Sequence, residues 1–230
     1  MGEEIALALA SRGVGIALLY RSSRKVAQEA VSKIRKAGGT AFTVRGNVAA
    51  ETGCRRAVEQ TASRLGGVDI LINMASRYEK RAWEKLSTRE WDEAMEVDAR
   101  GSYLMSLAAA PAMRRRGGGR IINFSDWVAV SGRPRYDSYI PYYTAKSAVL
   151  GLTQALALDL APKILVNAIA PGPILPPPGM SAKEKAQVIR STPLARWGDP
   201  REIAKAVLFL VESDYVTGEC IRVDGGRHLR

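Results

Sequence analysis

A tyrosine and a lysine stand four positions apart in the third quarter of the chain. Tyr142 and Lys146 lie in a segment with helical spacing, so both side chains are expected on one face of a helix. A phenol titrates near pH ~10 and is a poor acid at neutral pH unless a nearby cation stabilises the phenolate. The ammonium of Lys146 supplies that cation, so the pair predicts a proton donor. The same spacing also suits an ordinary amphipathic helix with a packed aromatic ring.

Polar residues follow several of the apolar runs in the sequence. Asn73 ends one run, Asp126 follows a second, and Pro171 and Gly172 follow a third. In open α/β sheets, ligands bind at the carboxyl ends of the parallel strands. We therefore expect these residues to share one edge of a sheet with the tyrosine helix.

Short apolar runs alternate with longer segments of helical spacing. The runs that predict strands are Val14–Tyr20, Ala41–Arg45, Val68–Asn73, Arg120–Phe124, Ile164–Ala168 and Cys220–Val223. The segments that predict helices are Glu3–Arg12, Ser23–Ala37, Glu51–Leu65, Thr88–Arg114, Tyr142–Leu160, Ala182–Arg190 and Pro200–Val211. This alternation indicates a doubly wound parallel sheet covered by helices on both faces, a three-layer α/β/α architecture. Because the sequence contains no segment typical of a linker between domains, residues 1–230 are expected to form one domain.

Composition narrows the class of protein. The chain has 230 residues, a formal net charge of +11 and 47% hydrophobic residues, which is typical of a globular protein with a full core. One histidine, His228, and two cysteines, Cys54 and Cys220, argue against histidine triads, structural zinc sites and a disulfide framework. We therefore expect no metal and a cytoplasmic location. The basic residues are scattered rather than clustered and no apolar run suits a membrane span, so neither nucleic acid nor a membrane is expected as a partner.

Taken together, these ordered motifs resemble the short-chain dehydrogenase/reductase family from Gly2 to Gly226. The resemblance implies a single Rossmann-type domain of seven parallel strands that binds NAD or NADP. It also implies that Tyr142 protonates the substrate oxygen, while Lys146 lowers the pKa of the tyrosine and holds the nicotinamide ribose.

The third catalytic position of that family is usually a serine, and here the matching frame places Asp126 there. An aspartate at this place resembles the pteridine reductase subgroup, in which it takes part in proton delivery to a reducible ring. Ser125 or Ser131 could serve instead, because the spacing from Asp126 to Tyr142 is longer than usual for the family.

The resemblance also assigns residues to the cofactor. Arg21 and Ser22 follow the second strand of the family pattern, where an arginine suits the 2′-phosphate of NADP. Asn47 and Val48 match the adenine contact. The remaining cofactor positions implied by the resemblance are Gly2, Asn73, Ala75, Ser76, Tyr142, Lys146, Pro171, Gly172 and Ile174.

Two departures from the family pattern stand out. Asp98 replaces an asparagine that normally helps connect the lysine to solvent, and its charge would perturb Lys146. Met1 and Gly2 match the end of the family's glycine motif, so we expect the first strand and the glycine-rich turn to be missing from this sequence.

The sequence thus predicts an NADP(H)-dependent reductase of a carbonyl or C=N bond in a pteridine-like ring or a ketone, with a substrate loop at about residues 171–190. A 3-oxoacyl carrier-protein reductase or a general alcohol dehydrogenase fits equally well. A catalytically impaired paralogue that binds a nucleotide or a protein is the alternative of another class. The family pattern favours a homotetramer.

Overall fold

The computed structural model describes residues 1–132, 137–177 and 179–230. Strands and helices alternate along this part of the chain, as predicted. The strands are β1 (Ile16–Tyr20), β2 (Ala41–Arg45), β3 (Ile70–Asn73), β4 (Gly119–Phe124), β5 (Ile164–Pro171) and β6 (Cys220–Val223). The α-helices are α1 (Gly2–Ala10), α2 (Arg24–Lys36), α3 (Glu51–Leu65), α4 (Thr88–Ala94), α5 (Gly101–Arg115), α6 (Trp127–Ser131), α7 (Ile140–Leu160), α8 (Ala182–Arg190) and α9 (Pro200–Glu212). Shorter helical segments are η1 (Trp83–Lys85), η2 (Met95–Arg100) and η3 (Arg227–Leu229).

All strand pairings among the described residues are parallel, but they form two sheets. One sheet contains β1 and β2, and the other has the order β3-β4-β5-β6. The parallel pairing agrees with the predicted doubly wound parallel sheet, which here is divided into two parts. The backbone ladder is interrupted between β1 and β3, and side chains join the two sheets instead: Ile16 of β1 and Ile122 of β4 belong to one apolar cluster. The predicted missing first strand stays a prediction.

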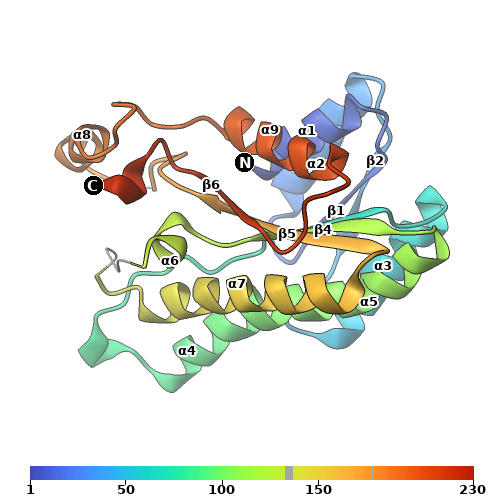
Figure 1. Cartoon of the computed structure of the whole chain (residues 1–230), viewed down its shortest axis with the longest axis horizontal. Helices are drawn as coiled ribbons and strands as arrows, with labels where there is room; N and C mark the ends of the chain where they lie inside the picture. Colours follow the sequence, from blue (N-terminus) through green and yellow to red (C-terminus); the bar gives the residue numbers. More distant parts are fainter. Residues whose placement is uncertain (133–136, 178) are drawn as a thin grey trace.

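Helices cover both faces of the strands, so the doubly wound three-layer arrangement is confirmed. In Figure 1, α1, α2 and α9 lie on one side of the strands, and α5 and α7 lie on the other. Successive residues of β4 point to opposite faces, as a pleated strand requires. Ile122 packs into the cluster that includes helices α1, α2 and α9, whereas Ile121 packs into the cluster beneath α3 and α5.

Helix α3 shows how local sequence sets the ends of these elements. It ends at Gly66, which adopts the left-handed conformation at φ 79°. A residue with a side chain is strained there, so glycine stops the helix and turns the chain toward β3. The predicted bounds of α3 and of α8 agree with the structure.

The prediction of one continuous helix over Thr88–Arg114 is wrong, because the segment is divided into three parts. The structure has α4, the π-helical segment η2 and then α5. A π-turn widens the helix, and such turns often occur at functional sites. Here the wide turn contains Asp98, which is buried, and its carbonyl accepts a hydrogen bond from Ser102 at 2.7 Å.

Within residues 1–132, 137–177 and 179–230, none of the helices combines the length and apolar character that crossing a membrane requires.

Candidate active site

The carboxyl ends of β3 to β6 lie along one edge of the four-stranded sheet. Asn73 pairs with Asn123 across β3 and β4, Phe124 pairs with Ile169, and Pro171 pairs with Val223. Because the strands are parallel and in register, the residues that follow each of them meet at this edge. The structure therefore brings together the polar strand ends predicted from the sequence.

A buried ladder of polar side chains crosses this edge and reaches helix α7. The Asn73 amide donates to the Asn123 side-chain oxygen at 2.9 Å, and the Asn123 amide donates to the Thr153 hydroxyl at 3.0 Å. Asn73 also donates to Ser106 of α5. All four side chains are buried. The ladder fixes α7 against β3 and β4, and so positions the residues of α7 that face the site.

Asp126 lies between β4 and α7 and contacts the predicted proton donor. It is the N-cap of α6, where its Oδ1 accepts the backbone N–H of Val128 at 2.8 Å. Its Oδ2 accepts the hydroxyl of Tyr142 at 2.8 Å. One carboxylate thus orients the phenol and satisfies the first turn of a helix.

Burial raises the pKa of the Asp126 carboxyl above its ordinary value. The Val128 N–H, the Tyr142 hydroxyl and the charge of Lys146 act in the opposite direction but do not offset the loss of hydration. Asp126 is therefore more easily protonated than an exposed aspartate, and it can hold a proton beside Tyr142.

Lys146 is buried and its ammonium has two close partners. It donates to the Phe124 carbonyl at 2.9 Å and lies 3.1 Å from Oδ1 of Asp98. The same nitrogen is 5.7 Å from the centre of the Tyr142 ring. The helical spacing of Tyr142 and Lys146 therefore does place a cation beside the phenol, as the sequence predicts.

The two serines considered in place of Asp126 are bonded elsewhere. The Ser125 hydroxyl donates to the backbone carbonyl of Lys146 at 2.9 Å, and Ser131 donates to the Val128 carbonyl at 2.9 Å. Asp126, in contrast, accepts the hydrogen bond of the Tyr142 hydroxyl at 2.8 Å. The geometry favours Asp126 as the third member of the site.

Two further tyrosines pack around Tyr142. The rings of Tyr78 and Tyr139 are stacked, with centroids 4.7 Å apart and an interplanar angle of 25°. The Tyr78 ring meets the Tyr142 ring edge-on at 4.9 Å. Tyr78 follows β3 and Tyr139 precedes α7, so an aromatic wall joins two segments that are far apart in the sequence. Tyr78 was not among the predicted site residues.

Helix α1 begins close to the end of β3. A Cβ on Gly2 would lie 3.4 Å from the sulfur of Met74, the residue after Asn73. Met1 gives the helix no side-chain cap. Unsatisfied N–H groups at a helix start suit a phosphate group. Glu3 in this first turn is paired with Lys33 at 2.6 Å, which reduces its repulsion of an anion. Glu4 is a second acidic residue in this turn, and the predicted phosphate contact at Gly2 stays a prediction.

The other predicted adenine-side residues lie after β1 and β2. Arg21 and Ser22 follow β1 directly and are exposed. The side-chain oxygen of Asn47 accepts the N–H of Ala49 at 3.2 Å, so it stabilises its own turn. Val48 contacts Gly101 at the start of α5: a Cβ on that glycine would lie 3.0 Å from Cγ2 of Val48.

The end of β5 is packed tightly against the end of β6. A Cβ on Gly172 would lie 2.5 Å from Cα of Asp224, and the Gly172 N–H donates to the Val223 carbonyl at 2.9 Å. Only glycine fits this approach without movement of the backbone. Ile174 is buried just beyond it, and Pro171 ends the strand. Ala75 and Ser76 are exposed after β3, and the Ser76 hydroxyl donates to Asp98.

The predicted substrate loop, residues 171–190, includes position 178, which lies outside the described residues. Its helix α8 begins with a capping box made by Ser181 and Glu184, and no residue of α8 is buried. Arg227 connects this helix to the site: it donates to the Val188 carbonyl at 3.0 Å, and its guanidinium lies 5.2 Å from the centre of the Trp127 ring.

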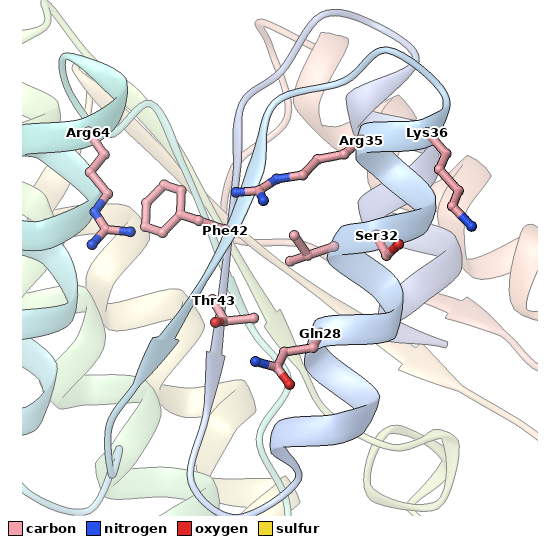
Figure 2. Close-up of a pocket in the computed structure, with 8 residues that line it drawn as sticks. Gln28, Ser32, Arg35, Lys36, Phe42, Thr43 and Arg64 are labelled. Atoms are coloured by element: carbon pink, nitrogen blue, oxygen red, sulfur yellow. The ribbon is translucent and has the colours of Figure 1, made fainter.

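A cavity of about 570 Å³ lies away from this site, between α2, β2 and α3 (Figure 2). Arg35 and Arg64 reach toward it from opposite sides of β2, and Phe42 lies between them. None of the residues that line it was predicted to bind a cofactor or a substrate.

The fold and the residues at its sheet edge define a Rossmann-type α/β protein with a tyrosine–lysine site. A family model described as enoyl-(acyl carrier protein) reductase matches residues 1–228. The chain is 33% identical over 234 residues to the 3-oxoacyl-[acyl-carrier-protein] reductase FabG of Staphylococcus aureus, and it covers 94% of that protein.

Comparison with solved structures indicates the same class of protein. A putative short-chain alcohol dehydrogenase from Sinorhizobium meliloti matches with a TM-score of 0.91 and 29% identity, over 99% of this chain and 92% of the other. FolM alternative dihydrofolate reductase 1 from Brucella suis, in complex with NADP, matches with a TM-score of 0.91 and 29% identity, over 100% of this chain and 91% of the other. The chain belongs to the short-chain dehydrogenase/reductase family, whose members are oxidoreductases that use nicotinamide cofactors.

Proposed function

We propose that this protein is an NADP(H)-dependent reductase of a carbonyl or C=N bond, with Tyr142 as the proton donor. One observation carries the proposal: the Tyr142 hydroxyl lies 2.8 Å from Asp126, beside the buried ammonium of Lys146. A phenol held between a carboxyl group and a cation is suited to general acid catalysis.

A nicotinamide dinucleotide would supply the hydride, and residues around the sheet edge would hold it. Gly2 and the start of α1 would face its phosphates, and Lys146 its ribose. Pro171, Gly172 and Ile174 would form the wall after β5. The close approach of Gly172 to Asp224 and the uncapped start of α1 support this assignment.

The side chains of the site divide the proton chemistry among them. Tyr142 donates its proton to the substrate atom that gains negative charge. Lys146 stabilises the phenolate that remains, because an ammonium close by favours the charged form. Asp126 holds a proton more readily than an exposed aspartate does and is bonded to the phenol, so it can return a proton to Tyr142.

We favour NADP over NAD because Arg21 and Ser22 follow β1, where an acidic residue would favour NAD. A guanidinium matches the geometry of a phosphate and makes charge-assisted hydrogen bonds to it. The NADP complex of the Brucella suis relative supports this choice.

Two substrate classes fit the site. Asp126 at the serine position and the aromatic wall of Tyr78 and Tyr139 favour a planar, pteridine-like ring, and the dihydrofolate reductase relative supports it. The FabG relatives support a 3-oxoacyl thioester on a carrier protein as the second candidate. The single domain, the closure of residues 171–190 over the substrate, the homotetramer and the cytoplasmic location stay predictions.

The test is NADPH oxidation by the full chain with a pterin, a simple ketone and a 3-oxoacyl thioester. Tyr142→Phe removes the donated proton and should lower kcat by about 100-fold or more, the usual contribution of a general acid. Binding of NADPH, followed by its fluorescence, should be retained.

Tyr143→Phe is the matched control, since Tyr143 is the adjacent tyrosine and the position four residues on is Ser147 rather than a lysine. Its kcat should stay within about twofold of the parent. Equal rates for the parent and Tyr142→Phe on every substrate would refute the proposed role of the phenol.

A further inference from the structure

Asp98 and Lys146 form an ion pair that is almost completely buried. Their side chains are 0% and 4% exposed, and Oδ1 of Asp98 lies 3.1 Å from the lysine nitrogen. Removing two charges from water is costly unless each charge is well compensated by the other and by hydrogen bonds. A pair of this kind therefore commits both side chains to one arrangement.

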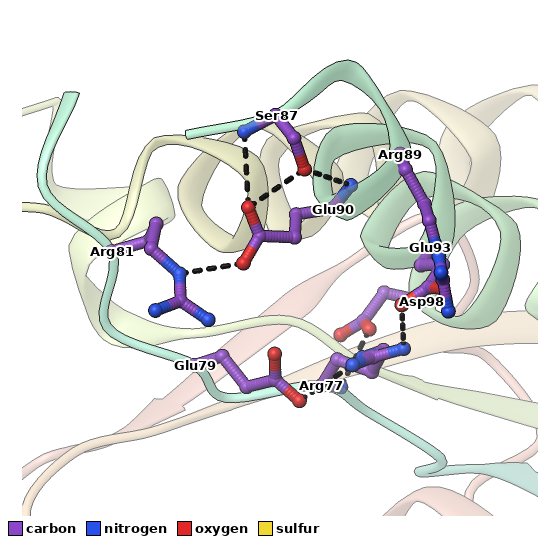
Figure 3. A network of polar contacts seen from close by, with 8 residues as sticks. All are labelled: Arg77, Glu79, Arg81, Ser87, Arg89, Glu90, Glu93 and Asp98. Carbon is purple, nitrogen blue, oxygen red and sulfur yellow. Dashed lines mark hydrogen bonds and ion pairs between the residues drawn. The ribbon is translucent and has the colours of Figure 1, made fainter. Parts of the chain in front are cut away.

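The remaining acceptor capacity of Asp98 is used on the segment that follows β3. The Ser76 hydroxyl donates to Oδ1, and the Arg77 backbone N–H donates to Oδ2 at 2.8 Å. Figure 3 shows the surrounding network, in which Arg77 also reaches Glu79 and Glu93. Asp98 is thus held by η2, by this segment and by the lysine at once.

The ammonium of Lys146 is consequently shared. It faces Asp98 from η2, the Phe124 carbonyl from β4, and Tyr142 on its own helix. The other charged group at the phenol is Asp126, at the start of α6. From α4, Glu93 faces Arg77 rather than the lysine. Arg77, Glu79, Arg81 and Glu90 line a pocket together with Tyr142, so these charged groups also face the phenol side of the site.

We propose that Asp98 is a positioning residue for catalysis: it fixes Lys146 beside Tyr142 and offsets part of the lysine charge, so that the phenol keeps its proton to a higher pH. This inference rests on the proposed function of Tyr142. It explains which charged group determines the pH range in which the phenol can donate its proton. A nearby negative charge disfavours loss of a proton from the phenol, whereas the lysine favours it.

The decisive experiment is the pH profile of NADPH oxidation by Asp98→Asn. This change keeps the shape of the side chain and removes its charge. The alkaline limb of kcat should move to lower pH by about 0.5–1 unit, because the uncompensated lysine promotes loss of the donated proton. A limb that stays in place in an active Asp98→Asn variant would overturn the proposal.

Glu93→Gln is the matched control. It removes one negative charge from the adjacent helix α4, where Glu93 pairs with Arg77 and Arg89 but not with Lys146. Its pH profile should coincide with that of the parent. A shift equal to that of Asp98→Asn would show a general effect of net charge and would also overturn the proposal.

A second measurement does not depend on activity. Urea midpoints are compared for Lys146→Met, Asp98→Asn and the double variant. Lys146→Met alone leaves a buried carboxylate without its partner, so its midpoint loss should be at least twice as large in the parent as in the Asp98→Asn background. Additive losses would overturn the ion pair as the positioning contact.

These two readouts separate the inference from the proposed function. If the parent reduces none of the three substrates, the proposed function fails, while the urea cycle still decides whether Asp98 holds Lys146. If the parent is active and Asp98→Asn is inactive at every pH, the urea cycle likewise decides: coupling supports the positioning role and additivity rejects it.

Discussion

The carboxylate of Asp126 joins the phenol of Tyr142 to the first turn of α6. Oδ2 accepts the Tyr142 hydroxyl and Oδ1 accepts the Val128 N–H, both at 2.8 Å. The orientation of the proposed proton donor and the start of this short helix therefore depend on one buried side chain. A change at Asp126 should be visible in stability as well as in activity.

The first prediction follows from the raised pKa of Asp126. Because burial makes the carboxyl easier to protonate in the folded chain than in the unfolded chain, its ionisation opposes folding as the pH rises. The cost is absent below the ordinary aspartate pKa and is complete above the raised one. Asp126→Asn removes the ionisation, so its Tm relative to the parent should rise as the pH is raised above the ordinary aspartate pKa of about 4.

Thermal unfolding at several pH values measures this difference. Asp224→Asn offers a comparison, because Asp224 is also buried but is paired with His228 at 2.7 Å. A Tm difference for Asp126→Asn that is flat or falls with pH would contradict the expectation.

The second prediction concerns the polar ladder. Asn123→Ala removes the acceptor of Asn73 and the donor to Thr153, leaving buried polar groups without these partners. Each such group costs about 1–3 kcal/mol, so the free energy of unfolding should fall by about 2–5 kcal/mol. Asn47→Ala makes the same chemical change at a partly exposed turn, where a loss of about 1 kcal/mol is expected. Urea denaturation compares the two, and similar losses would argue against the ladder as the support of α7.

The third prediction tests the contact between the ends of β5 and β6. Gly172→Ala places a methyl group 2.5 Å from Cα of Asp224 and should cost about 1–3 kcal/mol by overpacking. Gly151→Ala in α7 is the control, since nothing lies within 4 Å of the new methyl group and alanine favours a helix by up to about 1 kcal/mol. Chemical denaturation should therefore give shifts of opposite sign.

The fourth prediction concerns cofactor choice. Arg21→Ala should raise the KM for NADPH by about tenfold while leaving the KM for NADH nearly unchanged, because only NADPH carries the 2′-phosphate. Arg24→Ala removes a neighbouring exposed guanidinium at the start of α2 and serves as the control. If both variants raise the KM for NADPH and the KM for NADH by the same factor, Arg21 does not bind the 2′-phosphate.

Much of the fold followed from local patterns. The apolar runs gave the strands because a buried parallel strand needs little more than β-branched and aliphatic residues. The spacing of Tyr142 and Lys146 was sufficient to place a cation near a phenol, since a regular helix fixes the relation of positions four apart. Asp126 was singled out because it follows a strand and because the family pattern places it at the third catalytic position.

What the sequence did not reveal depends on contacts between distant segments. Asn123 and Thr153 are thirty positions apart, and only the packing of α7 on β4 brings them together. In the sequence, such a residue is visible only as a polar position in an apolar segment. A residue that binds a ligand gives the same pattern. The π-turn that directs Asp98 inward was likewise invisible, because the helical periodicity on either side of it is nearly unbroken.

The separation of the strands into two sheets has a consequence for motion. β1 and β2 share ladder hydrogen bonds only with each other among the described strands, so no strand pairing ties them to β3–β6. Their amide hydrogens should exchange with deuterium sooner than those of β4 and β5, which are paired on both sides. Since Arg21 follows β1, the proposed contact with the 2′-phosphate would lie on the pair of strands that exchanges sooner, while Tyr142 and Lys146 lie on a helix packed against β4 and β5.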